Sequence, residues 1–530
     1  MSMYVPCAAH SCAIFRDYCW LTRLLGQAIS INMLPDEVLV KIFHFYQLIF
    51  RYTFYYLEKR IIESWQTLVH VCQQWRSVVF GSTQRLDPRL YFTPRTIRDK
   101  LNVWPPLPIL ISNRDAHGKI RDRVWRHWKD KTDIDNVVAF LGHSDRVRLI
   151  NLVDIESSHH LEEFSAAMQK PVPQLTDLTL HGKTLVRMPV VPDSFLGGSA
   201  PCLRELSLER IPFPGLPKLL LSATNLVGLH LFYIPYSGYI SPEKMLATLS
   251  VLTKLRSLHL QFKSPQSRHN QESRHPSPPS RCVLPALTSL KFRGFISYLE
   301  DLVARIDAPQ LGLLFTNFFN QIEFDTPELV QFIRRTPTLK EFEKAGVSFE
   351  YGVTRVNLAS ITSGYRTLSV GNVSTKHAGH LSSLQQVFTS SLPPLSKLEE
   401  LYFFSYGFAP LDWQSYVQTI PLTELFRSFS AVKNLYLSEE VAEIIACSMK
   451  ELVGGGMTEV LPNLENIFVE FFGPGPVQED IGQFVAARQA TGGYPIAVID
   501  WYRYTEKALY VAYDGDDCDP DEYMKEDDDW

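Results

Sequence analysis

The chain has 530 residues, of which 45% are hydrophobic, 12% aromatic and 21% charged, and its formal net charge is −5. This apolar content excludes wholesale disorder and is sufficient for a large core. No run of about 18 uncharged apolar residues occurs, so no membrane-spanning helix is expected. The eight cysteines are too scattered for a disulfide framework, which suits a reducing cytoplasm or nucleus. Charged residues near the N-terminus (Arg16, Asp17 and Arg23) argue against a secretory signal.

The charge is concentrated at one end. Residues 514–530 hold ten acids and one lysine, a charge of −9, and the preceding chain therefore carries +4. A nearly neutral body argues against a protein that follows nucleic-acid phosphates. The acidic tail is predicted to be solvated and disordered, with docking onto a basic partner as the alternative.

The first structured segment is expected to be a helix over 32–46. Pro35 suits the first turn, and Asp36 and Glu37 suit its positive end. A second apolar helical segment covers 65–80. A helical hairpin of about 50 residues cannot bury this much apolar surface alone, so a partner or the rest of the chain is expected to cover it.

Two motifs in these segments, LPDEVLVKIF and LVHVCQQWR, resemble the F-box, a short helical module that docks onto the Skp adaptor of SCF ubiquitin ligases. Three further segments are similar to segments of a large family of fungal F-box proteins: RLDPRLYFTP, WPPLPILI and FLGGSAPCLRELSL. This looser similarity extends from about residue 32 to residue 505. The sequence departs from the F-box pattern by an aromatic insertion at 47–62. The resemblance implies adaptor binding by Leu34, Pro35, Glu37, Val38, Leu39, Ile42, Phe43, Leu68, Val71, Cys72 and Trp75.

A repeated hexamer follows, in which the first, fourth and sixth residues are apolar, although the copies that begin at 311 and 339 lose the last apolar residue. Successive copies start about 29 residues apart on average, and a proline, serine, threonine or aspartate lies two residues before each. At the ninth position, where regular leucine-rich repeats carry asparagine, eight copies have an apolar residue: Ile155, Ile211, Ile234, Phe295, Phe319, Val347, Val373 and Phe472. The twelve copies begin at 147, 175, 203, 226, 255, 287, 311, 339, 365, 398, 432 and 464.

Helical periodicity fills several intervals between hexamers, at 242–252, 298–306, 327–335, 381–392 and 439–453. A strand followed by a helix predicts right-handed βα units that stack on their neighbours. The expected fold class is α/β: an N-terminal helical F-box, then an irregular leucine-rich-repeat-like solenoid of about twelve units, with one parallel sheet in sequence order. The alternative is an ordinary α/β domain with similar strands.

The predicted domain organisation follows from these patterns. Residues 264–281 contain no large apolar side chain and are expected to form a disordered loop within the array. The expected parts are a disordered leader (1–31), the F-box (32–92), a connector (93–140), the solenoid (141–505) and the acidic tail (506–530).

The sequence lacks the common motifs of enzymes. The chain contains no GxxxxGK[ST], GxSxG, HExxH or paired CxxC motif. His377 and His380 have no carboxylate or cysteine at ligand spacing, and the spacing of the cysteines in 7–19 fits no known zinc-ligand pair. A non-catalytic chain without a metal or cofactor is therefore expected.

Target recognition is predicted on the sheet surface. If the first, fourth and sixth hexamer residues point into the core, the third and fifth point away from it. Late in the array these outward positions include Glu400, Tyr402, Asn434, Tyr436 and Phe468, which would form an exposed aromatic strip with polar neighbours. The alternative is that helices or segment 476–505 cover these rings.

Three functions remain open at this stage. The first is a substrate-recognition subunit of an SCF-type ubiquitin ligase, cytoplasmic or nuclear and monomeric alone, whose partners are the Skp adaptor, the cullin and a target protein. The second is a repeat scaffold or cargo-binding protein without a role in ubiquitin transfer. The third is an enzyme with a dispersed active site. No residue reveals the identity of the target.

Overall fold

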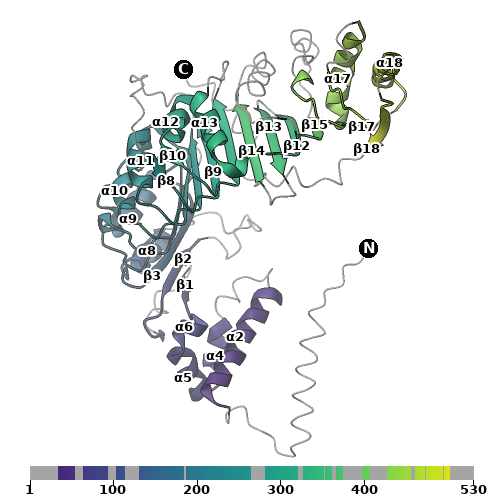
Figure 1. Ribbon diagram of the computed structural model, residues 1–530. Coiled ribbons are helices and arrows are strands. Elements are labelled where there is room, and N and C mark those ends of the chain that lie inside the picture. The colour runs from purple at the N-terminus through teal and green to yellow at the C-terminus, as the bar shows by residue number, and fades with distance from the viewer. Residues whose placement is uncertain are drawn as a thin grey trace, which may run out of the picture. The chain divides into compact units, whose positions relative to one another are not determined.

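The computed structural model in Figure 1 divides into two compact units, unit 1 comprising 1–140 with 146–149, and unit 2 comprising 141–145 with 150–530. The domain boundaries predicted from the sequence stay predictions. The structure describes residues 34–53, 64–92, 103–113, 131–183, 187–263, 281–319, 326–350, 353–360, 366–373, 395, 397–405, 426–454, 460–471, 473–492 and 494–501. The leader, the loop residues 264–280, the predicted helix at 381–392, the two histidines at 377 and 380, the cysteines in 7–19 and the acidic tail lie outside these ranges.

The first described helices of unit 1 are α2 (Asp36–Thr53), α4 (Ser64–Val69), α5 (Gln73–Gly81) and α6 (Thr83–Leu86). Helix α2 starts at the predicted acidic turn and continues through the first part of the insertion; residues 54–63 are not described. The segment expected as one helix over 65–80 is divided in two. The chain breaks at Cys72, whose Sγ accepts the Trp75 backbone N–H (3.5 Å) and caps α5.

The described residues of unit 1 also form two strands and one helix that the sequence patterns did not predict. They are β1 (Leu90–Phe92), β2 (Ile109–Ser112), parallel to β1, and α8 (Lys131–Leu141). Phe92 of β1 stacks on Phe140 of α8 with ring centroids 4.3 Å apart. Every residue of β2 is buried, so this strand lacks the polar and apolar alternation that would mark it in the sequence.

Unit 2, which contains the repeats and is called the repeat unit below, is built on a large, mainly parallel sheet. Within unit 2 the strand order is β3-β4-β5-β6-β7-β9-β11-β14-β13-β12-β15-β16-β17-β18, and β8 (Cys282–Val283) and β10 (Ile306–Asp307) form a separate pair. The remaining strands are β3 (Val147–Ile155), β4 (Asp177–Gly182), β5 (Glu205–Glu209), β6 (Gly228–Ile234), β7 (Ser257–Phe262), β9 (Ser289–Gly294), β11 (Leu313–Phe319), β12 (Lys344–Glu350), β13 (Val353–Ser360), β14 (Arg366–Val373), β15 (Glu400–Ser405), β16 (Asn434–Leu437), β17 (Asn466–Glu470) and β18 (Ala497–Trp501). The predicted pairing of β5 with β4 and β6 is confirmed.

The prediction that the strands follow sequence order is wrong between β11 and β15. Strand β13, which was not predicted, runs antiparallel between β12 and β14. Only 351–352 separate β12 from β13, and only 361–365 separate β13 from β14, so neither connection is long enough for a parallel crossover. The three strands therefore form a meander. As a result β14 pairs with β11, and β12 pairs with β15.

One hexamer was also placed in the wrong register. The copy at 339–344 was expected to be a strand, but Pro337–Leu339 is a 3₁₀ turn and β12 starts only at Lys344. Lys344 pairs with Glu400, which is the third residue of its own hexamer, so the matching hexamer is 342–347. Its first, fourth and sixth residues, Phe342, Ala345 and Val347, are buried.

The α-helices of unit 2 that the structure describes are α9 (Ser158–Ala167), α10 (Leu216–Leu220), α11 (Pro242–Leu249), α12 (Ile296–Val303), α13 (Pro327–Arg335), α17 (Glu439–Glu451) and α18 (Pro476–Ala490). Four of the five predicted helices are present at about the expected positions, and the fifth is not described. In Figure 1, α9 to α13 lie side by side along one face of the sheet. We call the opposite sheet face the far face.

Neighbouring repeats of unit 2 are joined by specific polar contacts as well as by apolar packing. The Glu300 carboxylate of α12 accepts the backbone N–H groups of Glu328 (2.9 Å) and Leu329 (2.8 Å), in the first turn of α13. Thr326, at the N-cap position of α13, makes no side-chain capping bond. A carboxylate from one repeat thus caps the helix of the next.

The strands end in a recurrent left-handed turn. Asp154, Arg210, Tyr233 and Phe471 all have positive φ, between 49° and 56°, and all occupy the eighth position of their repeat. Of these four residues only Asp154 is of a type that adopts this conformation readily, so residue type alone does not predict the turn. After Asp154, Arg210 and Tyr233, the apolar ninth residue (Ile155, Ile211 or Ile234) is buried in the core, at the position where regular repeats carry asparagine.

Candidate interaction surfaces

The residues predicted to bind an adaptor differ in exposure. Leu39, Phe43 and Leu68 are buried within unit 1, and Leu34, Cys72 and Trp75 are half-buried. The remaining five are exposed: Pro35, Glu37, Val38, Ile42 and Val71. The three buried residues therefore form the core of the module. The five exposed residues are not covered by the rest of unit 1.

Trp75 belongs mainly to the packing of the module. Its ring lies 4.7 Å from that of Phe43, at an interplanar angle of 57°, and joins α5 to α2. Its indole Nε1 is buried and has no hydrogen-bond partner among the described residues. Replacing Trp75 would therefore disturb the fold of the module, and adaptor binding is better tested at exposed positions.

An exposed apolar stripe runs along α2. Val38, Ile42 and Phe45, at positions i, i+4 and i+7, are 40%, 39% and 50% exposed. We call these three residues the α2 stripe. Val71, between α4 and α5, is also exposed. Phe45 was not among the predicted adaptor-binding residues, although its helical spacing from Val38 and Ile42 would have indicated it.

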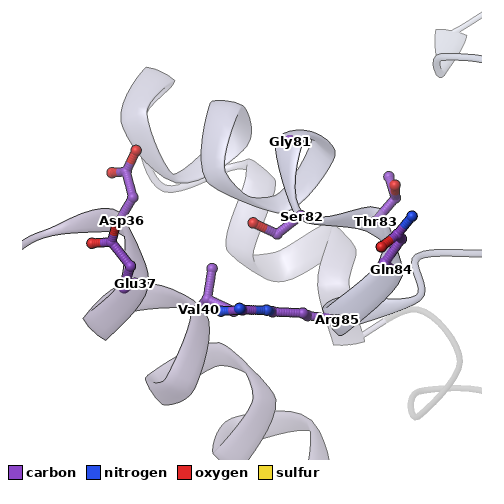
Figure 2. A pocket seen from close by; sticks show the side chains of 8 residues that line it. All are labelled: Asp36, Glu37, Val40, Gly81, Ser82, Thr83, Gln84 and Arg85. Carbon is purple, nitrogen blue, oxygen red and sulfur yellow. The ribbon is translucent and has the colours of Figure 1, made fainter.

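A cavity of about 340 Å³ lies beside the start of α2. Figure 2 shows Asp36 and Glu37 on one side and the Gly81–Arg85 segment on the other, with Val40 between them. Its lining includes no histidine or cysteine to act as a base or nucleophile. Among the described residues, no group of three or more potential metal ligands occurs. No described helix is long and apolar enough to cross a membrane.

Residues of the far face form continuous rows across the sheet, because paired residues of neighbouring strands share a face. The row of fifth hexamer positions contains Thr179, Ser207, His230, His259, Lys291, Phe315, Ser369, Asn357, Gly346, Tyr402, Tyr436, Phe468 and, on β18, Ile499. The register therefore determines which side chains from distant repeats become neighbours.

The predicted aromatic strip is an internally packed ladder. Tyr402 stacks on Tyr436 (4.1 Å), and Tyr436 stacks on Phe468 (4.4 Å), both pairs inclined by only 7°. The Tyr402 hydroxyl donates to the Glu400 carboxylate (2.6 Å). The expectation of three exposed rings is wrong for Tyr402, which is fully buried, whereas Tyr436 and Phe468 are half-buried.

The polar members of the predicted strip are also engaged. Glu400 pairs with Lys344 (2.6 Å), and Asn434 Oδ1 accepts a hydrogen bond from the Asn466 side chain (2.8 Å). The role of Glu400, Tyr402, Asn434, Tyr436 and Phe468 in target binding stays a prediction. Because the stacked rings bury much of one another's surface, a smaller area of these side chains is available to a partner than the sequence indicated.

The early strands give the far face an acidic character. Asp177 of β4 pairs with Glu205 of β5, and burial together with Asp177 raises the pKa of the Glu205 carboxyl. Glu209, at the end of β5, contacts His181 (2.8 Å) and Arg210. Burial opposes ionisation of Glu209, but its bonds to His181 and Arg210 lower its pKa overall.

The middle of the far face is basic. Strands β7, β9, β11, β14 and β13 place fifteen residues there in three rows. Among these fifteen, Lys291, Arg293 and Arg355 are the charged residues at neutral pH, and none is acidic. We call Lys291, Arg293, Arg355 and the polar residues beneath them, Gln261, Asn317 and Ser369, the central basic surface.

The polar residues beneath these charges are almost completely buried. Gln261 is 1% exposed and Asn317 is 7% exposed. Neither amide atom of Gln261, nor Asn317 Oδ1, nor the Ser369 hydroxyl has a hydrogen-bond partner among the described residues. Gly371 provides the space for Asn317, because a Cβ at Gly371 would lie 2.0 Å from Asn317 Oδ1. Buried polar atoms without partners are rare, and they often indicate a bound water or ligand.

Two histidines border the central basic surface. Burial, and secondarily Lys291, lowers the pKa of His230. Burial lowers the pKa of His259 to about 3, with further contributions from Lys291, His230 and Arg293. Both imidazoles are therefore neutral at neutral pH, and the positive charge of this surface comes from its lysine and arginines.

The buried His259 should make stability depend on pH. Its pKa in the folded state is below the unfolded value of 6.5, so the unfolded chain binds more protons and stability falls as the pH drops below about 6.5. Between about pH 7 and pH 5 the loss should reach about 2 kcal/mol. Urea denaturation at both pH values, compared with His259→Gln, measures it; an equally steep loss in the variant would contradict the assignment.

Comparison with known proteins gives little independent guidance. No protein-family model matches the chain, and no curated protein matches it. The chain is similar to the crystal structure of the leucine-rich repeat-containing protein LegL7 from Legionella pneumophila, with 14% identity and a TM-score of 0.27 over 63% of this chain and 96% of that one. A likeness this weak carries no argument. The strand register and the stacked βα units themselves define a leucine-rich-repeat-like repeat protein.

Proposed function

We propose that this protein is the substrate-recognition subunit of an SCF-type ubiquitin ligase. In this proposal the helices of unit 1 bind the Skp adaptor, which connects them to the cullin, and the repeat unit holds a target protein. The chain itself performs no chemistry. It raises the concentration of the target near the ubiquitin-conjugating partner.

The observation that carries the proposal is the α2 stripe. Val38, Ile42 and Phe45 expose three large apolar side chains on one side of one helix, next to the packed Phe43–Trp75 pair. A continuous apolar helix face is typical of recognition by a groove or by another helix. Its position within LPDEVLVKIF, the motif that resembles the F-box, supports the Skp adaptor as the partner.

One observation favours the alternative, a repeat scaffold that binds partners without ubiquitin transfer. Helix α2 continues to Thr53, so the first part of the insertion extends the helix that would meet the adaptor. An adaptor would have to accommodate this extra length. Copurification of the cullin distinguishes the two functions, because a scaffold has no reason to retain it.

Charged substitutions in the α2 stripe should abolish adaptor binding. In Val38→Asp/Ile42→Asp, binding would require two carboxylates to be buried in an apolar contact, so affinity for the Skp adaptor should fall by more than about 100-fold. The measurement is copurification of the adaptor and cullin with tagged full-length protein. Because both residues are exposed, the helical content should be unchanged.

A control variant places a single carboxylate elsewhere on the helix. His44 is exposed and, by helical spacing, lies away from the stripe, so His44→Asp should keep both partners. A folded Val38→Asp/Ile42→Asp variant that retains the adaptor and cullin at wild-type levels would refute the ligase proposal.

A further inference from the structure

The α2 stripe is left uncovered by the residues of unit 1 that the structure describes. Val38, Ile42 and Phe45 are 40%, 39% and 50% exposed. Leu39 and Phe43, on another side of the same helix, are buried in the module. Helix α2 therefore has one apolar side that is packed and a second that faces solvent, which is typical of a helix that accepts a further helix as a partner.

The leader carries a matching apolar stripe in its sequence. The members of this stripe recur at intervals of three and four residues, and they are Ile14, Tyr18, Leu21, Leu25 and Ile29. At about 100° per residue these side chains share one helix face, whereas Arg16, Arg23 and Gln27 fall on the opposite face. The sequence thus predicts an amphipathic helix over 12–29, of the same length as α2 (18 residues). We call the five apolar residues the leader stripe.

We infer that the leader folds back on α2 as a helix and covers the α2 stripe with the leader stripe, so that the Skp adaptor has to displace it. The inference concerns regulation of the proposed adaptor site and so rests on the proposed function. Most of the stability of an amphipathic helix comes from the packing of its apolar face, so the leader by itself is expected to be disordered.

The spacing of the two stripes suits packing against each other. In α2, Val38, Ile42 and Phe45 are separated by four and then three residues. In the leader, the first four members of the stripe are separated by four, three and four residues. Alternating intervals of four and three let two helices lie side by side, with the side chains of each in the gaps of the other.

The connection between the two segments favours packing within one chain. Only residues 30–35 lie between the predicted helix and the start of α2 at Asp36. Pro35 disfavours a helical conformation of Leu34, which separates the two helices. Connections of about two to eight residues join helices that are antiparallel neighbours. So short a tether also keeps the leader at an effective concentration of about 1 mM or more, which favours it over the leader of another copy.

Competition for the α2 stripe lowers the apparent affinity for the adaptor. A partner that binds only the uncovered form has its affinity reduced by the fraction of molecules in that form. If the leader covers the stripe in about nine-tenths of the molecules, removing this cover raises the affinity about tenfold.

The first experiment measures docking of the leader without any adaptor. Hydrogen exchange of the full-length protein should be slowed over 14–29. Leu21→Asp/Leu25→Asp places two carboxylates in the contact and should return these amides to the exchange rates of an unfolded chain. Val38→Asp/Ile42→Asp should have the same effect on 14–29, because it places the carboxylates on the other side of the same contact.

Arg23→Asp/Gln27→Asp is the matched control. It introduces two carboxylates on the opposite face of the predicted helix, so exchange over 14–29 should stay slow. The slowed exchange should also be independent of protein concentration, because the contact lies within one chain.

The second experiment measures the affinity of the full-length protein for the Skp adaptor by titration. Leu21→Asp/Leu25→Asp leaves every proposed adaptor-binding residue intact and should bind the adaptor about tenfold more tightly than the wild type. Arg23→Asp/Gln27→Asp should bind it with wild-type affinity.

Four results would overturn the inference. Leader amides that exchange at unfolded rates in the wild type, or that stay protected in Val38→Asp/Ile42→Asp, would mean that the leader does not cover the α2 stripe. Protection that appears only at high protein concentration would assign the contact to a second copy. Equal adaptor affinity of the wild type and Leu21→Asp/Leu25→Asp would exclude competition. If no variant binds the adaptor although the leader is protected, the proposed function fails and the docking of the leader stands, so the two failures are distinguishable.

Discussion

Replacing Trp65 by alanine is expected to destabilise unit 1 by about 3–5 kcal/mol, the usual cost of removing a fully buried large aromatic ring. Trp65 is 1% exposed. Its ring makes edge contacts with Trp104 (5.1 Å) and Phe80 (5.9 Å). Its indole N–H donates to the Arg89 carbonyl (3.0 Å), so the variant would also leave this carbonyl without its donor.

Hydrogen exchange measured on peptides from α2, α4 and α5 is the appropriate readout, because it reports the stability of unit 1 by itself. Trp75→Ala is the matched comparison. Trp75 is only half-buried and its indole nitrogen has no hydrogen-bond partner in the described part of the chain, so a smaller increase in exchange is expected. If the two variants exchange alike, Trp65 does not have the central place in unit 1 that its contacts indicate.

The strands of the repeat array could be predicted because a local pattern encodes them. In β5, for example, Leu206 and Leu208 are buried and Ser207 between them is partly exposed, as the alternating hexamer requires. The same rule failed at β12 to β14. There, an apolar spacing that fits a strand at 339–344 also fits the turn that precedes β12, and periodicity alone cannot distinguish the two.

The central basic surface could not have been found from the sequence. Arg355 lies on β13, a strand that the hexamer pattern did not predict, and the register places it level with Arg293 at a separation of three strands. Without that strand, no sequence motif relates Arg355 to Lys291 and Arg293.

The aromatic ladder shows a different limit of sequence reasoning. The hexamer pattern correctly assigned Tyr402, Tyr436 and Phe468 to the face opposite the helices. It could not show that identical register would stack the rings on one another, with Trp501 of β18 packed edge-on against Tyr436 (5.4 Å). Aromatic residues that are paired across adjacent strands bury one another, so exposure does not follow from facing outward.

The second large effect is expected at Arg488, near the end of α18. Its guanidinium is buried and donates to the backbone carbonyls of Val460 and Leu461, both at 2.8 Å. Burial lowers the pKa of Arg488 below its ordinary value, which shows that the site disfavours the charge that these bonds compensate. Leu461 has a positive φ of 46°, which is a strained backbone conformation. The hydrogen bond from Arg488 to its carbonyl therefore stabilises a strained turn just before β17.

Arg488→Ala should therefore lower the free energy of unfolding by about 2–5 kcal/mol, because it leaves two buried carbonyls without these donors and removes the packing of the long side chain. Arg488→Lys should recover only part of the loss, since an ammonium cannot reproduce the planar fork that reaches both carbonyls. Arg488→Met retains the apolar stem and separates packing from hydrogen bonding. Chemical denaturation, with hydrogen exchange across 460–471, measures each variant. If lysine matches arginine, or if methionine is as stable as the wild type, the forked hydrogen bonds do not hold this turn, and packing alone accounts for the buried position of Arg488.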